Sequence, residues 1–597
     1  MRKSEINNRH TLITGNKCGR ILSQISEKNR GSIGSYVRRA TAVTLAAAML
    51  GASLPVYAKA PETGNVTNVV SDGKGRNIND EADSVDGSVS STSNSDVDKV
   101  GKADDIQGNN VDDTEAGNTA SDGNAAGKAD DVVTLRVCNW EEYIDLGGWD
   151  EDEAMELENG QTICGDRPIY QEFEDWYYEN YGVKVKVEYS CFGTNEELYS
   201  MLTLGDKYDL VCPSDYLIMK LMKEEAVVPF SDEFFDQSKE DNYYVKGVSP
   251  YIRNVFDENE INGESWSKYA AGYMWGLTGI LYNPEYVSYD EASTWAIINN
   301  PKFSRQVTVK DNVRDTYFAA LGVYKHDLLT SDEFVNASDY SNRLLEEMND
   351  VSEDTIDDVG NLLQDVRDNV YAFETDSGKA DIVSGKIVAN YQWSGDAVYA
   401  MDQAEEDGVS LDFAIPEECT NLWFDGWVML KSGISEDSRK QQAAEAFVNY
   451  VSRPDNAVRN MYYIGYTSVI SGGDDDTIID YVDYNFGAEE DEEDTFDYNL
   501  GYFFAGDKNS EDYIVTAPME QMNRQLTAQY PSAEDISHSA IMLCFDDDAA
   551  ANINQMWIDV RCYNIKDVPV GIWIFAGAVV VLIVAAIMRK KMQMRKY

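Results

Sequence analysis

Histidine is scarce in this sequence: 597 residues contain three, and only His326 and His538 lie beyond residue 58. Histidine-dependent hydrolysis is therefore poorly supported. The eight cysteines form no C-x-x-C pair, which argues against a zinc or redox motif. Ser384-Gly385-Lys386 lacks the upstream glycine and the following serine or threonine of a phosphate loop, and the acidic run from Asp474 has Ile479 where a calcium loop needs glycine. We therefore expect no cofactor and no metal site.

Basic residues are also in short supply. Lysine and arginine number 49 against 106 aspartates and glutamates, which gives a formal net charge of −57. A surface this acidic repels the phosphates of nucleic acids and anionic lipid headgroups, and it favours cations as partners. Part of the charge lies in runs such as residues 489–494, which are typical of solvated loops. The charge therefore argues against a nucleic-acid partner, but it does not locate a binding site.

Aromatic residues and leucine are absent from residues 61–131, which consist mainly of Asp, Gly, Asn, Ser and Val. Such a segment cannot bury enough apolar surface to offset the entropy lost on ordering, so we expect 59–131 to be a disordered acidic linker. Residues 1–58 combine a basic start with an apolar run that ends in Val56-Tyr57-Ala58, the layout of a secretory signal peptide. No cysteine follows this run, which argues against a lipid-anchored N-terminus.

A long uncharged run near the C-terminus extends from Val568 to Met588. It is long enough to cross a bilayer as a helix, and the basic residues of 589–597 are those expected on the cytoplasmic side. We therefore expect a transmembrane helix at 567–588 and a basic cytoplasmic tail at 589–597. The rest of the mature chain would be extracytoplasmic, at the cell surface or in the periplasm, and anchored in the cytoplasmic membrane.

The remaining region, residues 132–566, alternates strand-like and helix-like segments. Such alternation predicts an α/β fold with a mostly parallel sheet, and two sets of segments predict two lobes with a ligand cleft between them. The first set has expected strands at 133–138, 183–188 and 208–211 and helices at 169–180 and 195–204; the second has strands at 307–310 and 387–392 and helices at 314–324, 332–349 and 443–451.

Seven cysteines lie in this region, and an odd number leaves at least one thiol without an intramolecular partner. A bridge between Cys138 and Cys191 and one between Cys164 and Cys191 are both compatible with the sequence, which does not choose between them.

Several expected strand ends combine aromatic side chains with carboxylates. Ring faces attract ammonium groups and carboxylates neutralise them, so the combination is typical of a pocket for a small organic cation. Ligands of open α/β sheets bind at the carboxyl ends of the strands, where these residues are expected. The clusters are residues 139–143, 210–216, 392–396 and 421–427, with a phenol added by Ile464-Gly465-Tyr466.

Motifs in this region resemble those of the periplasmic polyamine-binding proteins, the spermidine/putrescine receptors of ATP-driven importers. The resemblance covers residues 132–566 and implies the two-lobed periplasmic-binding-protein fold. It also implies a polyamine ligand and, as partners, the permease and ATPase subunits of an ABC transporter. The motifs occur in family order: Asn139-Trp140-x-x-Tyr143, Asp209-Leu-Val-x-Pro-Ser214-x-Tyr216, Trp275-Gly-x-Thr-Gly-Ile, Trp393-Ser-Gly-Asp396, Trp423-Phe-Asp425 and Gly465-Tyr466.

The same resemblance implies the residues that would line the site. On one lobe the polyamine would contact aromatic and hydroxyl side chains, and further aromatic residues would face them and complete a cage. The residues concerned are Trp140, Tyr143, Ser214 and Tyr216 on the first lobe, with Trp393, Trp423 and Tyr466 opposite.

Acidic residues would pair with the ammonium groups of the ligand. The resemblance implies this role for Asp425, and for Asp396 in the putrescine-preferring branch of the family. The family has a pair of acidic residues in this segment. Asp315 matches one of them, and the amide Asn312 stands in place of the other. Glu141 stands where relatives carry a smaller hydroxyl residue, and we include it among the ligand-binding candidates.

These observations predict a membrane-anchored receptor, not an enzyme, that captures putrescine or spermidine and delivers it to an ABC importer. Two alternatives remain open. One is a ligand-sensing receptor domain for another organic cation. The other is a secreted glycoside hydrolase with paired carboxylates, for which no pair stands out beyond the binding clusters.

Overall fold

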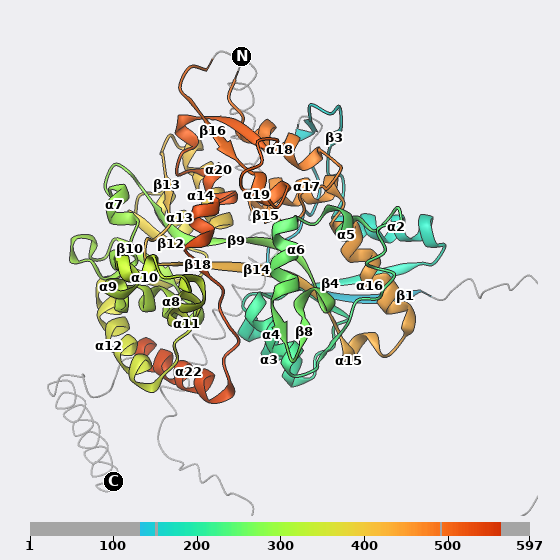
Figure 1. The fold of residues 1–597 in the computed structure, drawn as a ribbon. Helices are drawn as coiled ribbons and strands as arrows, with labels where there is room; N and C mark the ends of the chain where they lie inside the picture. Colours follow the sequence, from blue (N-terminus) through green and yellow to red (C-terminus); the bar gives the residue numbers. More distant parts are fainter. Residues whose placement is uncertain (1–131, 150–152, 490–491, 563–597) are drawn as a thin grey trace, which may run out of the picture. The chain divides into compact units, whose positions relative to one another are not determined.

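The computed structural model describes residues 132–149, 153–489 and 492–562 (Figure 1). All of them belong to one structural unit of the chain. The expected signal peptide at 1–58, the acidic linker at 59–131 and the basic tail at 589–597 lie outside the described residues.

Twelve of the described strands form one mixed sheet, with the central order β11-β10-β12-β9-β14-β5-β1-β4. Each end of this order is a parallel block, as the alternating pattern predicts. Val137 and Cys138 are adjacent on β1, so their side chains point to opposite faces, and both are fully buried, in line with a sheet covered on both faces. The strands of the two blocks are β1 (Val133–Trp140), β4 (Val185–Phe192) and β5 (Leu210–Val211), and β10 (Val307–Lys310), β11 (Ala372–Glu374) and β12 (Ala389–Trp393).

Two long antiparallel strands join the parallel blocks: β9 (Ala270–Tyr282) and β14 (Thr420–Leu430). The first part of β9 pairs with β14, and its last five residues pair with β12, so one strand serves both lobes (Figure 1). Every residue of both strands is buried. Neither strand was predicted from the sequence, because both are buried on both faces and show no regular alternation of apolar and polar residues.

The first lobe is built around β1, β4 and β5 and shares one large hydrophobic core with the start of β9 and most of β14. Its main helices all contribute buried residues to this core. They are α2 (Ile169–Tyr181), α3 (Asn195–Leu204), α4 (Asp215–Lys223), α6 (Pro250–Glu258), α16 (Ser438–Val451), α17 (Pro454–Ile464) and α18 (Thr477–Phe486).

The second lobe has its own core around β10, β12 and the end of β9. The helix expected at 332–349 is divided into α10 (Asp332–Val335) and α11 (Tyr340–Met348). The division follows Asn336, whose side-chain amide donates to the carbonyl of Asp332 and so competes with continued helical hydrogen bonding. The other main helices of this lobe are α8 (Val313–Tyr324), α12 (Glu353–Asn369), α13 (Gly378–Val383), α14 (Ser394–Glu406) and α22 (Asp547–Arg561).

The expectation of a C-terminal transmembrane helix is corrected here. A helix must be long and almost free of charge to cross a bilayer, and none in the described part of the chain meets both requirements. The longest described helices, such as α12, carry charged residues throughout. Residues 567–588 themselves lie outside the described ranges. The fold that the structure supports is therefore the two-lobed α/β fold alone.

Neither expected disulfide is present. All seven cysteines of the described region are free, including Cys138, Cys164 and Cys191. Cys138 and Cys191 lie on the adjacent parallel strands β1 and β4, where Cys138 pairs with Ser190 and Cys191 with Asn139. The offset by one residue places their side chains on opposite faces of the sheet, which explains why adjacent strands do not bring the two sulfurs together.

Candidate functional site

Asp425 is the centre of one group of the expected residues. It lies on β14 at a register shift between Asp425 and Gly426, and irregularities of this kind re-aim a strand's side chains. The hydroxyl of Tyr143 donates to its Oδ2 and that of Ser214 to its Oδ1, both at 2.7 Å. The structure thus joins three residues that sequence analysis placed in one site, two of them from different strand ends of the first lobe.

Asp425 is only 5% exposed, and in residues 132–149, 153–489 and 492–562 no lysine or arginine forms an ion pair with it. Burial raises the pKa of Asp425 to about 6, although the hydrogen bonds from Ser214 and Tyr143 lower it. Asp215 lies nearby and accepts backbone hydrogen bonds from Tyr216 and Phe424; burial raises its pKa to about 8. Arg314 lowers the pKa of Asp215 from a distance, whereas among the described residues no basic side chain is a partner of Asp425.

Aromatic rings surround this carboxylate. The ring of Tyr143 meets those of Tyr466 and Tyr273 edge to face, with centroids 5.0 and 5.6 Å away, and Trp423 lies 5.7 Å from Tyr466. The buried indole N–H of Trp423 has no acceptor among the residues that the structure describes. The arrangement offers electron-rich ring faces and a negative charge, which are the two requirements for holding an ammonium group.

Asp396, at the start of α14, is the centre of a second group. Its Oδ1 accepts a hydrogen bond from Tyr466 at 3.0 Å and pairs with the ammonium of Lys379 at 3.2 Å, while Lys310 lies 3.6 Å from Oδ2. Burial raises the pKa of Asp396, but the two ammonium groups and the phenol lower it more, and the pKa lies below its ordinary value. The side chain of Asp396 is therefore already neutralised within the protein.

Tyr466 connects the two groups, and Gly395 allows it to do so. A Cβ atom on Gly395 would lie 2.3 Å from the ring of Tyr466, a distance that real side chains do not show. Any larger residue at position 395 would displace the ring from both carboxylate groups. This explains why a glycine stands in the Trp-Ser-Gly-Asp segment.

Asp315 and Trp393 lie together in the second lobe. The indole N–H of Trp393 points to Oδ1 of Asp315 at 3.4 Å, and burial raises the pKa of Asp315 to about 6. Asn312, the amide that replaces an acidic residue of the family pattern, caps α8 by accepting hydrogen bonds from the backbone N–H groups of Arg314 and Asp315. Its role here is therefore explained by helix capping.

Three expected residues lie outside these groups. Glu141 is exposed, and Trp140 packs against Phe192 with ring centroids 4.7 Å apart. Tyr216 donates to Glu196, and the guanidinium of Arg314 covers its ring at 4.5 Å. In the described part of the chain, no recorded hydrogen bond or ring contact joins any of the three to Asp425 or Asp396.

Sequence analysis missed Lys310 and Lys379. Lys310 ends β10 and is completely buried, which is unusual for a lysine. The available signal was a charged residue at the end of a strand-like run, but lysines are so common at such positions that the signal is weak.

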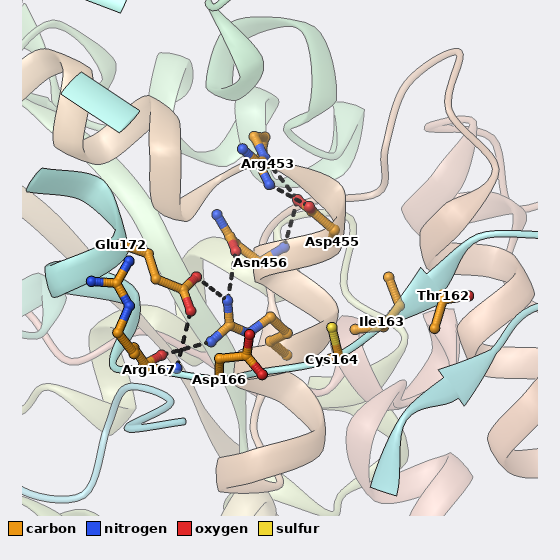
Figure 2. Close-up of a pocket in the computed structure, with 10 residues that line it drawn as sticks. Thr162, Ile163, Cys164, Asp166, Arg167, Glu172, Arg453, Asp455 and Asn456 are labelled. Atoms are coloured by element: carbon orange, nitrogen blue, oxygen red, sulfur yellow. Dashed lines mark hydrogen bonds and ion pairs between the residues drawn. The ribbon is translucent and has the colours of Figure 1, made fainter. Parts of the chain in front are cut away.

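Figure 2 shows a cavity of about 350 Å³ lined by other residues, from the segment before α2 and the start of α17. Its charged groups neutralise one another: Arg459 pairs with Glu172 at 2.6 Å and with the buried Asp145 at 2.7 Å, and Arg453 pairs with Asp455. Because these arginines are held by carboxylates of the protein, we assign no ligand to this cavity.

Comparison with known proteins identifies what this chain is similar to. The sequence model of a family described as "Bacterial extracellular solute-binding protein" matches residues 169–482. The chain is 26% identical over 285 residues to the "Spermidine/putrescine-binding periplasmic protein" of Escherichia coli (strain K12), covering 47% of this chain and 70% of the relative. It is 27% identical over 335 residues to the "Putrescine-binding periplasmic protein PotF" of the same organism, covering 54% of this chain and 74% of that protein.

Among solved structures, the chain is similar to the spermidine/putrescine ABC transporter substrate-binding protein PotD from Streptococcus pneumoniae. The TM-score is 0.45 at 20% identity, and the match covers 72% of this chain and 98% of the other. A lipoprotein of Treponema pallidum gives a TM-score of 0.46 at 18% identity, with 72% and 99% covered.

Proposed function

The chain belongs to the family of bacterial extracellular solute-binding proteins, and we propose that it is a receptor that captures a polyamine, putrescine or spermidine, and delivers it to an ABC importer. The names of its relatives support this ligand class, since they describe proteins that bind spermidine and putrescine. Permease and ATPase subunits of the importer would be the protein partners.

The observation that carries the proposal is the buried carboxylate of Asp425. A charge that is taken out of water without a counter-ion is strongly destabilising, and here Tyr143 and Ser214 supply hydrogen bonds but no positive charge. An ammonium group of the ligand would supply the missing charge. The rings of Tyr143, Trp423 and Tyr466 would then cover the methylene groups beside it and exclude water.

Binding without catalysis is the better account of these residues. A glycosidase needs one carboxyl that is free to donate a proton and another that acts as nucleophile or base. Asp425 has a raised pKa, but both of its oxygens accept hydrogen bonds from Tyr143 and Ser214. Asp396 is paired with Lys379 and Lys310, so it is not free to act as acid, nucleophile or base. The relatives are also named as binding proteins.

Calorimetric titration of the purified protein with putrescine, spermidine, spermine and a neutral sugar tests the proposal. We expect one-to-one binding of a polyamine, no binding of the sugar, and a loss of at least about thirtyfold in affinity for Asp425→Asn, because truncating one member of a buried charge pair costs about 2 kcal/mol or more.

Asp232→Asn is the matched control, since it removes the same charge from an exposed position and should leave the affinity unchanged. Failure of every polyamine to bind, or an Asp425→Asn protein with the affinity of the unaltered one, would refute the proposal.

A further inference from the structure

Trp393 and Asp396 form an ammonium-binding arrangement that the protein itself occupies. The Nζ atom of Lys310 lies 3.9 Å from the centre of the Trp393 ring and 3.6 Å from Oδ2 of Asp396. An aromatic face beside a carboxylate is the environment in which the ammonium of a bound amine is held. Here the lysine of the neighbouring strand fills it.

Lys310 is held firmly in this position. It ends β10 beside Glu374 of β11, its side chain is 0% exposed, and its ammonium donates to the carbonyl of Thr375 at 3.0 Å. Burial lowers the pKa of Lys310, while Asp396 and Glu374 raise it. A buried ammonium with these partners is part of the built structure and is not a solvated side chain that moves aside at no cost.

A second cation also occupies Asp396. Lys379, on α13, pairs with the other oxygen of Asp396 at 3.2 Å and also with Asp376 at 2.8 Å. An ammonium of the ligand that approached Asp396 would therefore meet two like charges within a few ångströms. In a site of low dielectric constant this repulsion opposes binding.

The two carboxylate groups consequently differ in what they can accept. Asp425 has hydroxyl donors and, within the described ranges, no cation, whereas Asp396 has two cations already. Resting on the proposed function, we infer that Lys310 determines ligand specificity: one ammonium of the bound amine is held at Asp425, and Lys310 prevents a second from binding at Trp393 and Asp396. The second amine of a diamine then adds little to the affinity.

The test compares putrescine with butylamine, which has the same four-carbon chain and a single amine. For the unaltered protein we expect the two affinities to agree within tenfold. In Lys310→Met, which replaces the ammonium by an uncharged side chain of similar length, we expect the ratio of putrescine to butylamine affinity to rise at least tenfold.

Lys386→Met is the matched control. Lys386 also lies over an aromatic ring, 4.6 Å from the centre of Tyr371, and pairs with Asp381 at 2.9 Å, but it is exposed. Lys386→Met removes the same charge from the second lobe. The ratio of putrescine to butylamine affinity should therefore equal that of the unaltered protein.

The outcomes separate the two proposals. If neither these two amines nor spermidine and spermine bind the unaltered protein, the proposed function fails and this inference fails with it. If only the longer polyamines bind, the inference alone is overturned. If putrescine binds the unaltered protein more than tenfold tighter than butylamine, or if folded Lys310→Met keeps the unaltered ratio, the inference alone is overturned. Should Lys310→Met not fold, Lys310→Gln is measured in its place, and the ratio of the unaltered protein still decides.

Discussion

The groups around Asp425 and Asp396 use the same kinds of residue. Each has a buried aspartate, a tyrosine hydroxyl that donates to its carboxylate, and a tryptophan nearby; Asp425 lies within β14, and Asp396 lies just beyond the end of β12. They differ in their cations: Asp396 has Lys310 and Lys379, and Asp425 has none in the described part of the chain. Aromatic and acidic residues therefore do not by themselves identify a ligand site, because the protein's own lysines can pair with the carboxylate and lie over the ring.

The largest expected difference between the two groups is in the stability of the ligand-free protein. Asp396→Asn leaves the buried ammonium of Lys310 without its carboxylate, and breaking a buried pair in this way costs about 3–5 kcal/mol. Asp425→Asn removes a buried charge that has no counter-ion, so at pH 7 the free energy of unfolding should rise or stay within about 1 kcal/mol. Urea unfolding of both variants checks this; equal destabilisation would contradict the comparison.

The second effect concerns pH. Because burial raises the pKa of Asp425 to about 6, from an ordinary value of 3.8, the folded protein keeps a proton between these pH values that the unfolded chain has lost. Asp425 therefore lowers the free energy of unfolding of the unaltered protein as pH rises from about 4 to 6. The Asp425→Asn protein has no carboxyl at this position and does not lose this stability. The stability of the variant relative to the unaltered protein should therefore increase by about 2 kcal/mol between pH 4 and 7.

Thermal or urea unfolding at several pH values measures this difference directly. Titrating groups that do not interact with Asp425 are common to both proteins and cancel in the comparison. Asp215 does not cancel, because the charge of Asp425 contributes to its raised pKa, so both proteins are also measured with Asp215→Asn added. A difference that does not change with pH would show that Asp425 is not buried as an uncompensated carboxylate.

The smallest expected effect is that of Gly395→Ala. It tests whether Tyr466 links the group around Asp396 to the group around Asp425. Gly395→Ala forces a Cβ atom into the Tyr466 ring and should cost about 1–3 kcal/mol in stability. Because the same ring contacts Tyr143 and Trp423, polyamine affinity should fall as well. Gly193→Ala is the control: its Cβ would meet only the end of the flexible Glu197 side chain, at 3.2 Å. Lost stability with unchanged affinity would separate Tyr466 from the ligand site.

Local elements of the fold could be predicted where the chain has clear periodicity. The helix at 195–204 and the strand at 307–310 were predicted with the bounds that the structure shows, because the first repeats apolar residues at helical spacing and the second alternates valine with polar residues. The strands β9 and β14 were not, since their sequences show no such regular alternation and their partners lie far away in the sequence. Those two strands connect the lobes, so the sequence pattern missed the element that joins them.

Residue types at expected strand ends, read from the sequence alone, predicted an α/β chain, which the structure confirms, and a site for an organic cation, which stays a prediction. The structure joins Tyr143 and Asp425, 282 positions apart, by a hydrogen bond, but Asp425 lies within β14 and not at the strand end expected for residues 421–427. Only the tertiary structure decided which carboxylate is left without a cation. Ion pairing depends on where a long side chain ends in space, and it is the packing of β10 against β12 that places the ammonium of Lys310 on Trp393 and beside Asp396.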